Sequence, residues 1–320
     1  MKLSTHNPGA GITLRRQQIE YREHAFTMLS DYSPKLVEVA RNLTQRYTSG
    51  RTNRAGELLP ILLSEIVSID AEQIKKVGGA WFCLYLYTLL LDDQMDNKYQ
   101  ATAAEYMAGT ALLSSGLLEL RKMVSGTAYE KDFEEAITRA ISGQAEDFEG
   151  SRQASGGDER VLQSQSKNQY LVALAHAFSA VSGQGEKLVP FVRNLTLAVQ
   201  YLDDISDFME DYHDGNFTVL LSKASSKTGS LHSNRSELLL DLVASGALLD
   251  VLSSTRDAID QALMHVDRTD KGALLPYMST IRSNVVDLIC DLSLPRQNHE
   301  IDLPSIQEID RKLTSIAFSS

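Results

Sequence analysis

The chain has 320 residues, 43% of them hydrophobic and 23% charged, which is the composition of an ordinary globular protein and excludes a disordered one. Its formal net charge of −11 at pH 7 argues against nucleic acid as a partner, because phosphate-backbone binding needs clustered Lys and Arg. The two cysteines, Cys83 and Cys290, are too few for a disulfide framework.

Apolar residues recur every three to four positions along most of the chain, which predicts helices. In chain order the predicted helices cover residues 15–29, 34–47, 57–69, 71–91, 101–124, 131–148, 161–181, 188–212, 236–252, 255–266, 271–292 and 303–316. No alternating pattern is long enough to build a sheet, so the predicted fold class is all-α. The main breaks fall at residues 48–54, 150–158, 213–235 and 294–304.

None of these breaks has the length or the low complexity of a linker between independent domains. We therefore predict one α-helical domain over residues 1–320, with a mobile stretch at residues 1–14. The N-terminal residues lack the apolar segment and cleavage site of a secretory leader, and we see no uninterrupted membrane-spanning run. A cytoplasmic protein without stable membrane insertion is expected.

The first of two acidic clusters, Asp92-Asp93-Gln94-Met95-Asp96, follows directly on the apolar helix predicted over residues 71–91. A spacing of four places Asp92 and Asp96 on one helix face. Carboxylates in such a position need cations, and carboxylate oxygens are ligands that Mg²⁺ prefers. Because Mg²⁺ sites with open positions are typically completed by substrate phosphates, the expected ligand is a diphosphate.

The second cluster, Asp203-Asp204-Ile205-Ser206-Asp207, follows another apolar run, within the helix predicted over residues 188–212. Here the polar residues fall on one stripe, which also includes Thr196, Gln200 and Asp211. Burying such a stripe without an ion or ligand would be costly, whereas a solvated stripe would need neither. Together with the first cluster, the stripe indicates two facing helices that hold divalent ions between them.

An aromatic stripe leads to the first cluster, because Trp81, Tyr85 and Thr88 share a helix face with Asp92. Aromatic faces stabilise a nearby positive charge by about 0.5 to 2 kcal/mol each, which would suit a carbocation beneath a metal-bound diphosphate. The alternative interpretation is that these aromatic residues simply belong to the core.

Weaker signals lie between the clusters. Gln144 and Asp147 are three residues apart on one predicted helix face, and Lys167 and Asn168 follow a polar stretch. Taken singly, such residues are more often solvated than functional.

In this order the features resemble the trans-isoprenyl diphosphate synthase and class I terpene synthase superfamily, over roughly residues 35–290. The resemblance implies a helical bundle around a central apolar cavity, with three Mg²⁺ ions and the diphosphate of an allylic prenyl substrate. It also implies a homodimer. In that family Asp92 and Asp96 would be metal ligands on one side and Asp203 and Asp207 on the other.

The same resemblance implies further roles. Asp93 would join the four metal-ligating aspartates in the catalytic set. Lys167 would grip the diphosphate and Gln200 would line the mouth of the site, with Lys98, Lys223 and Arg282 as other candidate cations. The substrate-binding set predicted from these considerations is Lys167, Gln200, Gln144, Trp81, Tyr85, Thr88 and Asp204.

Three departures from the family's pattern concern the second substrate. Chain-elongating members hold isopentenyl diphosphate with a Gly-Gly-Lys-x-x-Arg-Pro segment, but residues 51–60 read Arg-Thr-Asn-Arg-Ala-Gly-Glu-Leu-Leu-Pro. The arginine pair after the first cluster is missing, and Gly215-Asn216 replaces a Gly-Lys after the second. Each charge-assisted contact that is lost contributes about 1.5 to 3 kcal/mol, so binding of a second diphosphate should be weak.

We therefore predict a class I terpene synthase, a lyase that ionises an allylic prenyl diphosphate and converts the cation to a cyclic or rearranged terpene. One alternative is a trans-prenyltransferase that uses isopentenyl diphosphate, with Arg51, Arg54 and Lys75 rebuilding the acceptor site. A second is a non-catalytic subunit of a related synthase. The length of the substrate chain and the product skeleton depend on the depth of the cavity and stay open.

Overall fold

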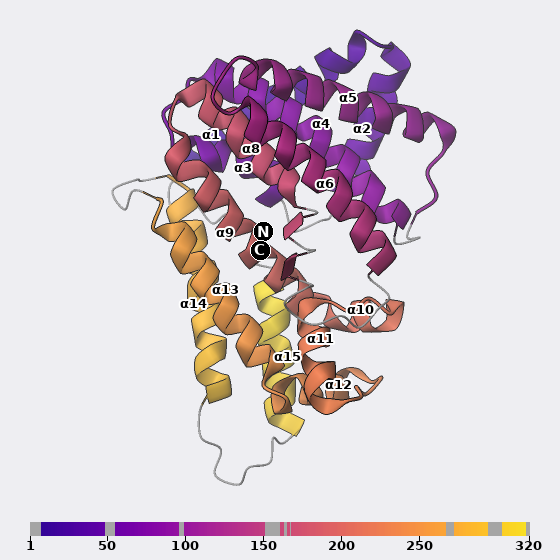
Figure 1. Ribbon diagram of the computed structural model, residues 1–320, viewed down its shortest axis with the longest axis vertical. Coiled ribbons are helices and arrows are strands. Elements are labelled where there is room, and N and C mark those ends of the chain that lie inside the picture. Colours follow the sequence, from indigo (N-terminus) through magenta and orange to yellow (C-terminus); the bar gives the residue numbers. More distant parts are fainter. Residues whose placement is uncertain are drawn as a thin grey trace. The chain divides into compact units, whose positions relative to one another are not determined.

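The computed structural model describes residues 8–48, 55–95, 99–150, 161–162, 165–166, 168–266, 272–293 and 303–317, with the side chains of 8–13, 55, 147–150, 303–304 and 314–317 left out. Every regular element within these ranges is a helix, which confirms the predicted all-α class. Figure 1 labels the helices in chain order.

The contacts divide the chain into two compact units. Unit 1 comprises Met1–Glu135, Val172–Val189 and Asp267–Leu274, and unit 2 comprises Ala136–Leu171, Pro190–Val266 and Leu275–Ser320. The first acidic cluster belongs to unit 1 and the second to unit 2. Most boundaries between the units fall inside helices and not in linkers, and the prediction of a single domain stays a prediction.

The helices of unit 1 are α1 (Pro8–Ser30), α2 (Pro34–Thr48), α3 (Ala55–Ser64), α4 (Ala71–Met95), α5 (Ala103–Val124) and most of α8 (Gln169–Ser182). Helix α4 packs against both α1 and α5 (Figure 1). Its Phe82 side chain is fully buried and meets the rings of Tyr21 and Phe26. The helix that carries the first acidic cluster is therefore the core helix of this unit.

Close helix packing around α4 depends on glycines. A Cβ added at Gly116 of α5 would lie 2.7 Å from the backbone oxygen of Ala80 and 2.9 Å from the side chain of Leu84. A Cβ at Gly79 of α4 itself would lie 2.7 Å from the ring of His24. All three distances are shorter than real Cβ atoms show, so only glycine lets the neighbouring helices approach this closely.

A network of polar contacts fixes the start of α5, just after the first acidic cluster. Thr102 and Glu105 form a capping box, in which each side chain accepts a hydrogen bond from the other residue's backbone N–H. The Glu105 carboxylate also accepts from the Tyr99 hydroxyl at 2.8 Å and pairs with Arg46 of α2 at 2.9 Å. The turn between α4 and α5 is thereby attached to α2.

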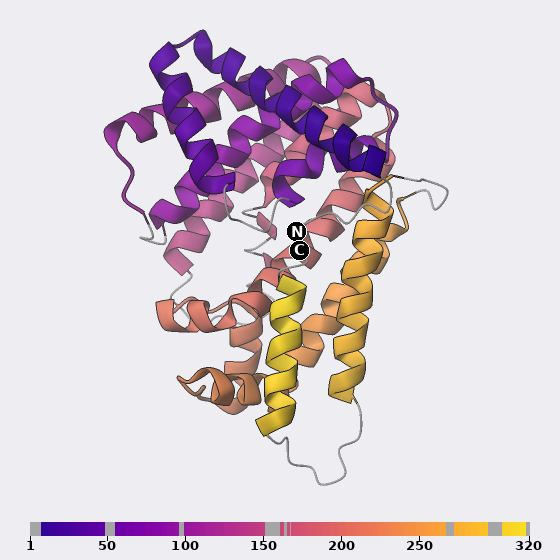
Figure 2. The ribbon, with the colours of Figure 1, turned by 180° about the vertical axis from the view of Figure 1, so that it is seen from behind.

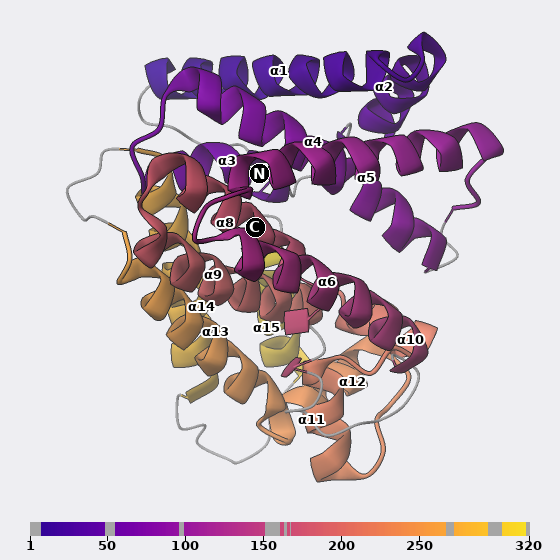
Figure 3. The ribbon, with the colours of Figure 1, turned by 45° about the horizontal axis from the view of Figure 1, so that its top comes forward.

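The helices assigned mainly to unit 2 are α6 (Glu130–Gly150), α9 (Gly185–Ser206), α10 (Phe208–Asp214), α11 (Val219–Thr228), α12 (Arg235–Ala244), α13 (Ala247–Leu263), α14 (Leu274–Ser293) and α15 (Leu303–Ala317). Helix α13 packs against α11 and α12, and α15 packs against α12 (Figure 2). An ion pair between Arg235 and Asp310, with an N–O distance of 2.7 Å, joins α12 to α15. The rotated view in Figure 3 shows α10, α11 and α12 grouped together.

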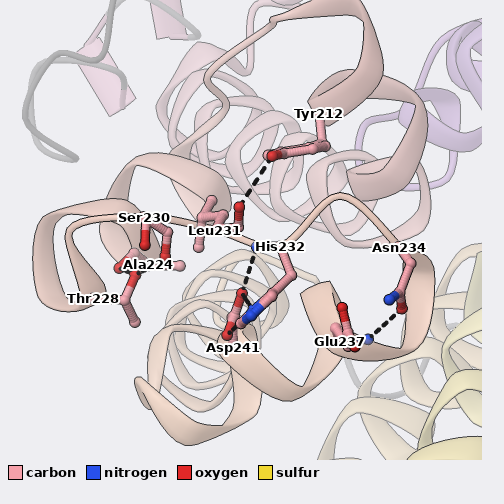
Figure 4. A network of polar contacts seen from close by, with 9 residues as sticks. All are labelled: Tyr212, Ala224, Thr228, Ser230, Leu231, His232, Asn234, Glu237 and Asp241. Carbon is pink, nitrogen blue, oxygen red and sulfur yellow. Dashed lines mark hydrogen bonds and ion pairs between the residues drawn. The ribbon is translucent and has the colours of Figure 1, made fainter.

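The connection from α11 to α12 is held by the polar network in Figure 4. The Tyr212 hydroxyl of α10 donates to the backbone oxygen of Leu231 at 3.1 Å. Asp241 of α12 accepts from the backbone N–H of His232 at 2.8 Å and lies 2.9 Å from the Nδ1 atom of the same residue. The loop after α11 is thus fastened to α10 and to α12.

Three element predictions need correction. Residues 188–212 are not one helix, because α9 ends at Ser206 and α10 begins at Phe208. The stretch 213–235, predicted as a break, contains α11, which is capped by Thr218 and ended by Gly229 at φ 76°. The break between α12 and α13 lies at Ser245 and Gly246, not near residue 253.

The described part of α1 begins at Pro8, inside the stretch predicted to be mobile. Helix α4 also differs from expectation, since by length and composition alone it could cross a membrane. However, 61% of its apolar window is buried within the protein, as in the core helix of a soluble domain. Helices α12 and α13 meet the same test only if taken together, and they are bent by 70°.

Candidate functional site

The first acidic cluster occupies the last turn of α4. The Asp92 side chain is exposed and that of Asp93 is half-buried, while Asp96 lies outside the described residues. The Asp93 carboxylate lies beside the hydroxyl of Tyr47 at the end of α2. Burial, and after it Asp93, raises the pKa of Tyr47. Asp92 and Asp93 thus differ in their surroundings, and sequence reasoning did not anticipate the part played by Tyr47.

The second acidic cluster lies where α9 gives way to α10. Asp203 and Asp207 are both exposed, and the Ser206 hydroxyl donates to Asp207 Oδ1 at 2.9 Å. Asp207 occupies the N-cap position of α10, but its side chain makes no capping hydrogen bond. Its carboxylate therefore stands at a helix junction without being used to cap the helix.

Asp204 differs from its two neighbours in the cluster. Its side chain is only 2% exposed, and both carboxylate oxygens accept hydrogen bonds. Oδ1 accepts from Nε2 of Gln200 and Oδ2 accepts from the backbone N–H of Val219, each at 2.9 Å. Gln200 Oε1 in turn accepts from Nδ2 of Asn168 at 3.1 Å. Gln200 and Asp204, both predicted to bind substrate, thus have partners within unit 2, and direct substrate contact stays a prediction.

The aromatic stripe of α4 is built into unit 1. Trp81 is 4% exposed, and its indole N–H donates to the backbone oxygen of Gly56 in α3 at 2.7 Å. The half-buried Tyr85 ring stacks with Trp81 at a centroid distance of 6.3 Å. Thr88, also half-buried, donates to the backbone oxygen of Tyr85 at 2.9 Å. Trp81 is therefore a core residue tied to α3, and Tyr85 and Thr88 lie nearer the surface of the unit.

The remaining predicted residues lie on α6, α11 and α14 or outside the described residues. Gln144 is half-buried on α6, whereas Lys167, Lys98 and the Asp147 side chain lie outside the described residues. Of the other candidate cations, Lys223 is half-buried on α11 and Arg282 forms an ion pair with Asp260. The pairing with Asp260 makes Arg282 a poorer candidate for gripping a diphosphate than the sequence suggested.

A surface cavity of about 250 Å³ lies in unit 1, lined by Met28, Asp31, Tyr32, Ser115, Leu118, Glu119 and Lys122. None of the predicted site residues lines it. The central apolar cavity implied by the resemblance stays a prediction.

No protein-family model matches the sequence, and no curated protein sequence is similar to it. Solved structures are similar in fold. The geranylgeranyl pyrophosphate synthetase of the archaeon Geoglobus acetivorans has a TM-score of 0.69 at 16% identity, over 88% of this chain and 100% of that one. The geranylgeranyl pyrophosphate synthase of Corynebacterium glutamicum has a TM-score of 0.67 at 20% identity, over 92% of this chain and 98% of that one.

A third neighbour is the polyprenyl synthase of Caulobacter crescentus, solved with calcium and isoprenyl diphosphate. Its TM-score is 0.63 at 16% identity, and 96% of this chain and 97% of that one are covered. The chain has the fold of the trans-isoprenyl diphosphate synthases. At these identities the likeness to the synthases concerns the fold, and the chemistry has to be argued from this chain's own residues.

The residues that could hold a metal in this synthase fold are the exposed aspartates. Carboxylate oxygens are the donors that hard divalent cations take, so Asp92, Asp203 and Asp207 fit such an ion chemically. Asp204 fits less well, because its oxygens face N–H donors. Within the described part of the chain, no group of three or more His, Cys, Asp or Glu side chains is arranged to hold a metal ion. The four-aspartate Mg²⁺ site is consequently still a prediction.

Proposed function

We propose that this chain is an enzyme that binds an allylic prenyl diphosphate with divalent cations and breaks the carbon–oxygen bond to the diphosphate. The observation that supports this proposal is that each of two long helices, α4 and α9, ends in an acidic cluster. The solved structures with this fold that are compared above are prenyl synthases. The solved complex of one neighbour with calcium and isoprenyl diphosphate supports the pairing of cation and ligand.

In this proposal Asp92, Asp96, Asp203 and Asp207 hold Mg²⁺, which when bound would neutralise the charge of the departing diphosphate. Lys167 grips the diphosphate from the protein side. The apolar and aromatic residues behind the clusters, among them Tyr85, exclude water from the allylic cation. Asp93, beside Tyr47, maintains the shape of the first cluster and is not a metal ligand.

The first candidate for the fate of the cation is condensation with isopentenyl diphosphate, which is trans-prenyl transfer. The solved structures compared above are named as geranylgeranyl and polyprenyl synthases, and this favours a transferase. Of the cations that could rebuild an acceptor site, Arg51 and Arg54 lie outside the described residues, and Lys75 pairs with Glu72 at 2.5 Å.

The second candidate is a lyase that forms a cyclic or rearranged terpene without an acceptor. If Pro60 is aligned with the proline of Gly-Gly-Lys-x-x-Arg-Pro, Gly56 and Leu59 stand in place of the lysine and the arginine. Leu59 is 4% exposed, and a Cβ on Gly56 would lie 2.9 Å from the Tyr85 ring. The two positions that carry the lysine and the arginine thus offer no cation here, and a side chain at position 56 would require movement of Tyr85, which favours a lyase.

The deciding experiment incubates purified protein and Mg²⁺ with geranyl, farnesyl and geranylgeranyl diphosphates, each with and without isopentenyl diphosphate. Longer prenols after dephosphorylation, formed only with isopentenyl diphosphate, would establish the transferase. Hydrocarbons or cyclic alcohols formed without it would establish the lyase. No consumption of any substrate under either condition, while the protein is folded, would overturn the proposal.

Two further points belong to the same proposal. A homodimer and a cytoplasmic location are what the resemblance implies, and sedimentation at several protein concentrations tests the first. For the second, the buried setting of α4 supports a protein that does not insert in a membrane.

A further inference from the structure

A continuous run of hydrogen bonds connects three polar side chains of unit 2 to the first residue of a helix. The run passes from Asn168 to Gln200, then to the buried carboxylate of Asp204, which also accepts from the Val219 N–H. Gln200 and Asp204 belong to α9, while Val219 begins α11. The segment between them, residues 207–218, includes the end of the second acidic cluster.

The direction of every bond in this run follows from the charge on Asp204. A carboxylate only accepts hydrogen bonds, so Gln200 must turn its NH₂ group towards Asp204 and its oxygen towards Asn168. Asn168 must then donate to Gln200. At the other oxygen, Asp204 satisfies the first N–H of α11, which has no partner within its own helix. One buried charge thus sets two amide orientations and the start of a helix.

From this geometry we infer that Asp204 is a positioning residue. It orients Gln200 and Asn168 and fastens the start of α11 to the end of α9, and the exposed Asp203 and Asp207 on either side of it bind the cation. This inference rests on the proposed function, since Asn168 directly follows Lys167, the residue assigned to grip the diphosphate. The inference gives the three aspartates of the second cluster two different roles, cation binding for Asp203 and Asp207 and positioning for Asp204. The sequence alone does not distinguish them.

Exchanging the amide of Gln200 with the carboxylate of Asp204 tests the inference. We call the hydrogen bonds from Asn168 through Gln200 and Asp204 to Val219 the relay. In Asp204→Asn the direction of its side-chain hydrogen bonds can reverse, because the new amide accepts from Val219 and donates to Gln200, whose NH₂ then faces Asn168. In the double variant Gln200→Glu/Asp204→Asn, the new carboxylate at position 200 accepts both from Asn168 and from the amide introduced at position 204. The exchange keeps the net charge and returns Asn168 to its original orientation.

Gln200→Glu alone should behave quite differently. Two carboxylates would face each other, that of Asp204 buried and that at position 200 half-buried, where Gln200 Nε2 now donates to Asp204. Their repulsion and the loss of this donor should destabilise the fold. The single variant should therefore melt well below the wild type at pH 7.5.

The measurements are thermal unfolding, and kcat and KM for the substrate that the wild type consumes, over a Mg²⁺ titration. We expect Asp204→Asn to keep most of its thermal stability and to raise KM roughly tenfold without changing the Mg²⁺ concentration for half-maximal rate. The double variant should regain most of that KM loss and melt well above Gln200→Glu. Asp203→Asn, the matched neighbour, should instead raise the Mg²⁺ requirement.

Two outcomes would overturn the inference. If Asp204 is a metal ligand, Asp204→Asn raises the Mg²⁺ requirement as Asp203→Asn does, and the double variant stays impaired. If the relay does not form, the double variant is no more stable than Gln200→Glu. Thermal unfolding needs no turnover, so a wild type that consumes no prenyl diphosphate would refute the proposed function and leave the relay itself tested.

Discussion

Individual carboxylates of the two acidic clusters differ in their exposure and in their hydrogen-bond partners. Asp203 and Asp207 face solvent, Asp204 is buried with both oxygens bonded, and Asp93 lies beside Tyr47. A carboxylate that is exposed at the junction of two helices can take a cation without first being drawn out of the protein interior. Buried carboxylates have to stay bonded to protein donors, because an unpaired charge in the interior is costly.

At this scale Asp203→Asn should reduce kcat by at least about 100-fold while leaving the melting temperature within about 1 °C of the wild type. The reason is that an amide is a poor Mg²⁺ ligand, and an exposed substitution removes few contacts. Steady-state kinetics and calorimetry check this, with Asp214→Asn as a control that makes the same change at an exposed residue of α10. Equal losses in the two variants would argue against a metal role for Asp203.

At the scale of elements, helix ends determine how the candidate site residues are presented. The capping box at the start of α5 gathers Thr102, Tyr99 and Arg46 around Glu105. Burial acts to raise the pKa of Glu105, but the hydrogen bonds from Thr102 and Tyr99 and the charge of Arg46 together lower it. The turn that follows Asp92 and Asp93 therefore depends on the ionised form of one glutamate.

Glu105→Gln should lower the free energy of unfolding by about 2 kcal/mol at pH 7, because charge-assisted hydrogen bonds become neutral ones. The folded pKa of Glu105 lies below its unfolded value. The stability that it contributes is thus present above the unfolded value, about 4.3, and is lost as the pH falls through the folded pKa. Urea unfolding of both proteins at pH 7 and below pH 4 should show the difference shrinking in acid. A constant difference would contradict the assignment.

The loop between α11 and α12 should respond to pH in the opposite sense. The hydrogen bond to Asp241, and then its charge, raises the pKa of His232. The stabilisation from this pair is fully present below the unfolded value, about 6.5, and is lost as the pH rises through the folded pKa. His232→Gln should accordingly lower the melting temperature more at pH 6 than at pH 9. His265→Gln in the same unit is the control, and an equal loss at both values would refute the assignment.

For the whole molecule, long-range polar contacts hold together segments of unit 1 that are far apart in sequence. The Glu65 carboxylate after α3 accepts from the backbone N–H groups of Ala273 and Leu274 at 2.9 and 2.7 Å. These are unpaired donors at the start of α14, so Glu65 acts as the cap of a helix more than 200 residues away. Unit 1 consequently cannot be completed until the chain has reached residue 274.

Glu65→Ala should lower the free energy of unfolding by about 2 kcal/mol, since it leaves two N–H groups without their acceptor. Trp81, the single tryptophan, reports on unit 1, and far-UV circular dichroism reports on all the helices. A single domain over residues 1–320 predicts that the two signals change at the same urea concentration, in the wild type and in the variant. Separate transitions would show two independent domains.

Helical periodicity predicted most of the fold, because core helices such as α4 and α5 are specified by their own apolar residues. The ends near the second cluster were not predictable in this way. Helix α9 stops at Ser206, the side chain of Asp204 bonds to Val219, and α11 begins within a stretch that the sequence pattern presents as a loop. The bond that fastens this start of α11 joins residues 15 apart, beyond the reach of a helical repeat.

The candidate site, too, was predictable only in part from the local sequence pattern. Local spacing was enough to single out Asp92, Asp203 and Asp207, which the structure places at helix ends, two of them in the same turn. The burial of Asp204 and the contact of Asp93 with Tyr47 depend on packing between helices, for which one sequence carries no direct signal. Trp81 was marked by its periodicity, but its bond to Gly56 required the position of α3.

The close contact of α5 with α4 at Gly116 means that a substitution far from the aspartates can affect the first acidic cluster. Gly116 lies against Ala80, twelve residues and about 18 Å of helix before Asp92. A methyl group at position 116 would force α4 and α5 apart. Because a helix is stiff, a displacement of α4 at Ala80 also moves its C-terminal end. Gly116→Ala should thus lower kcat although the substitution adds one methyl group far from the aspartates. An alanine at Gly126, where nothing lies within 4 Å of the added Cβ, should affect only the local backbone.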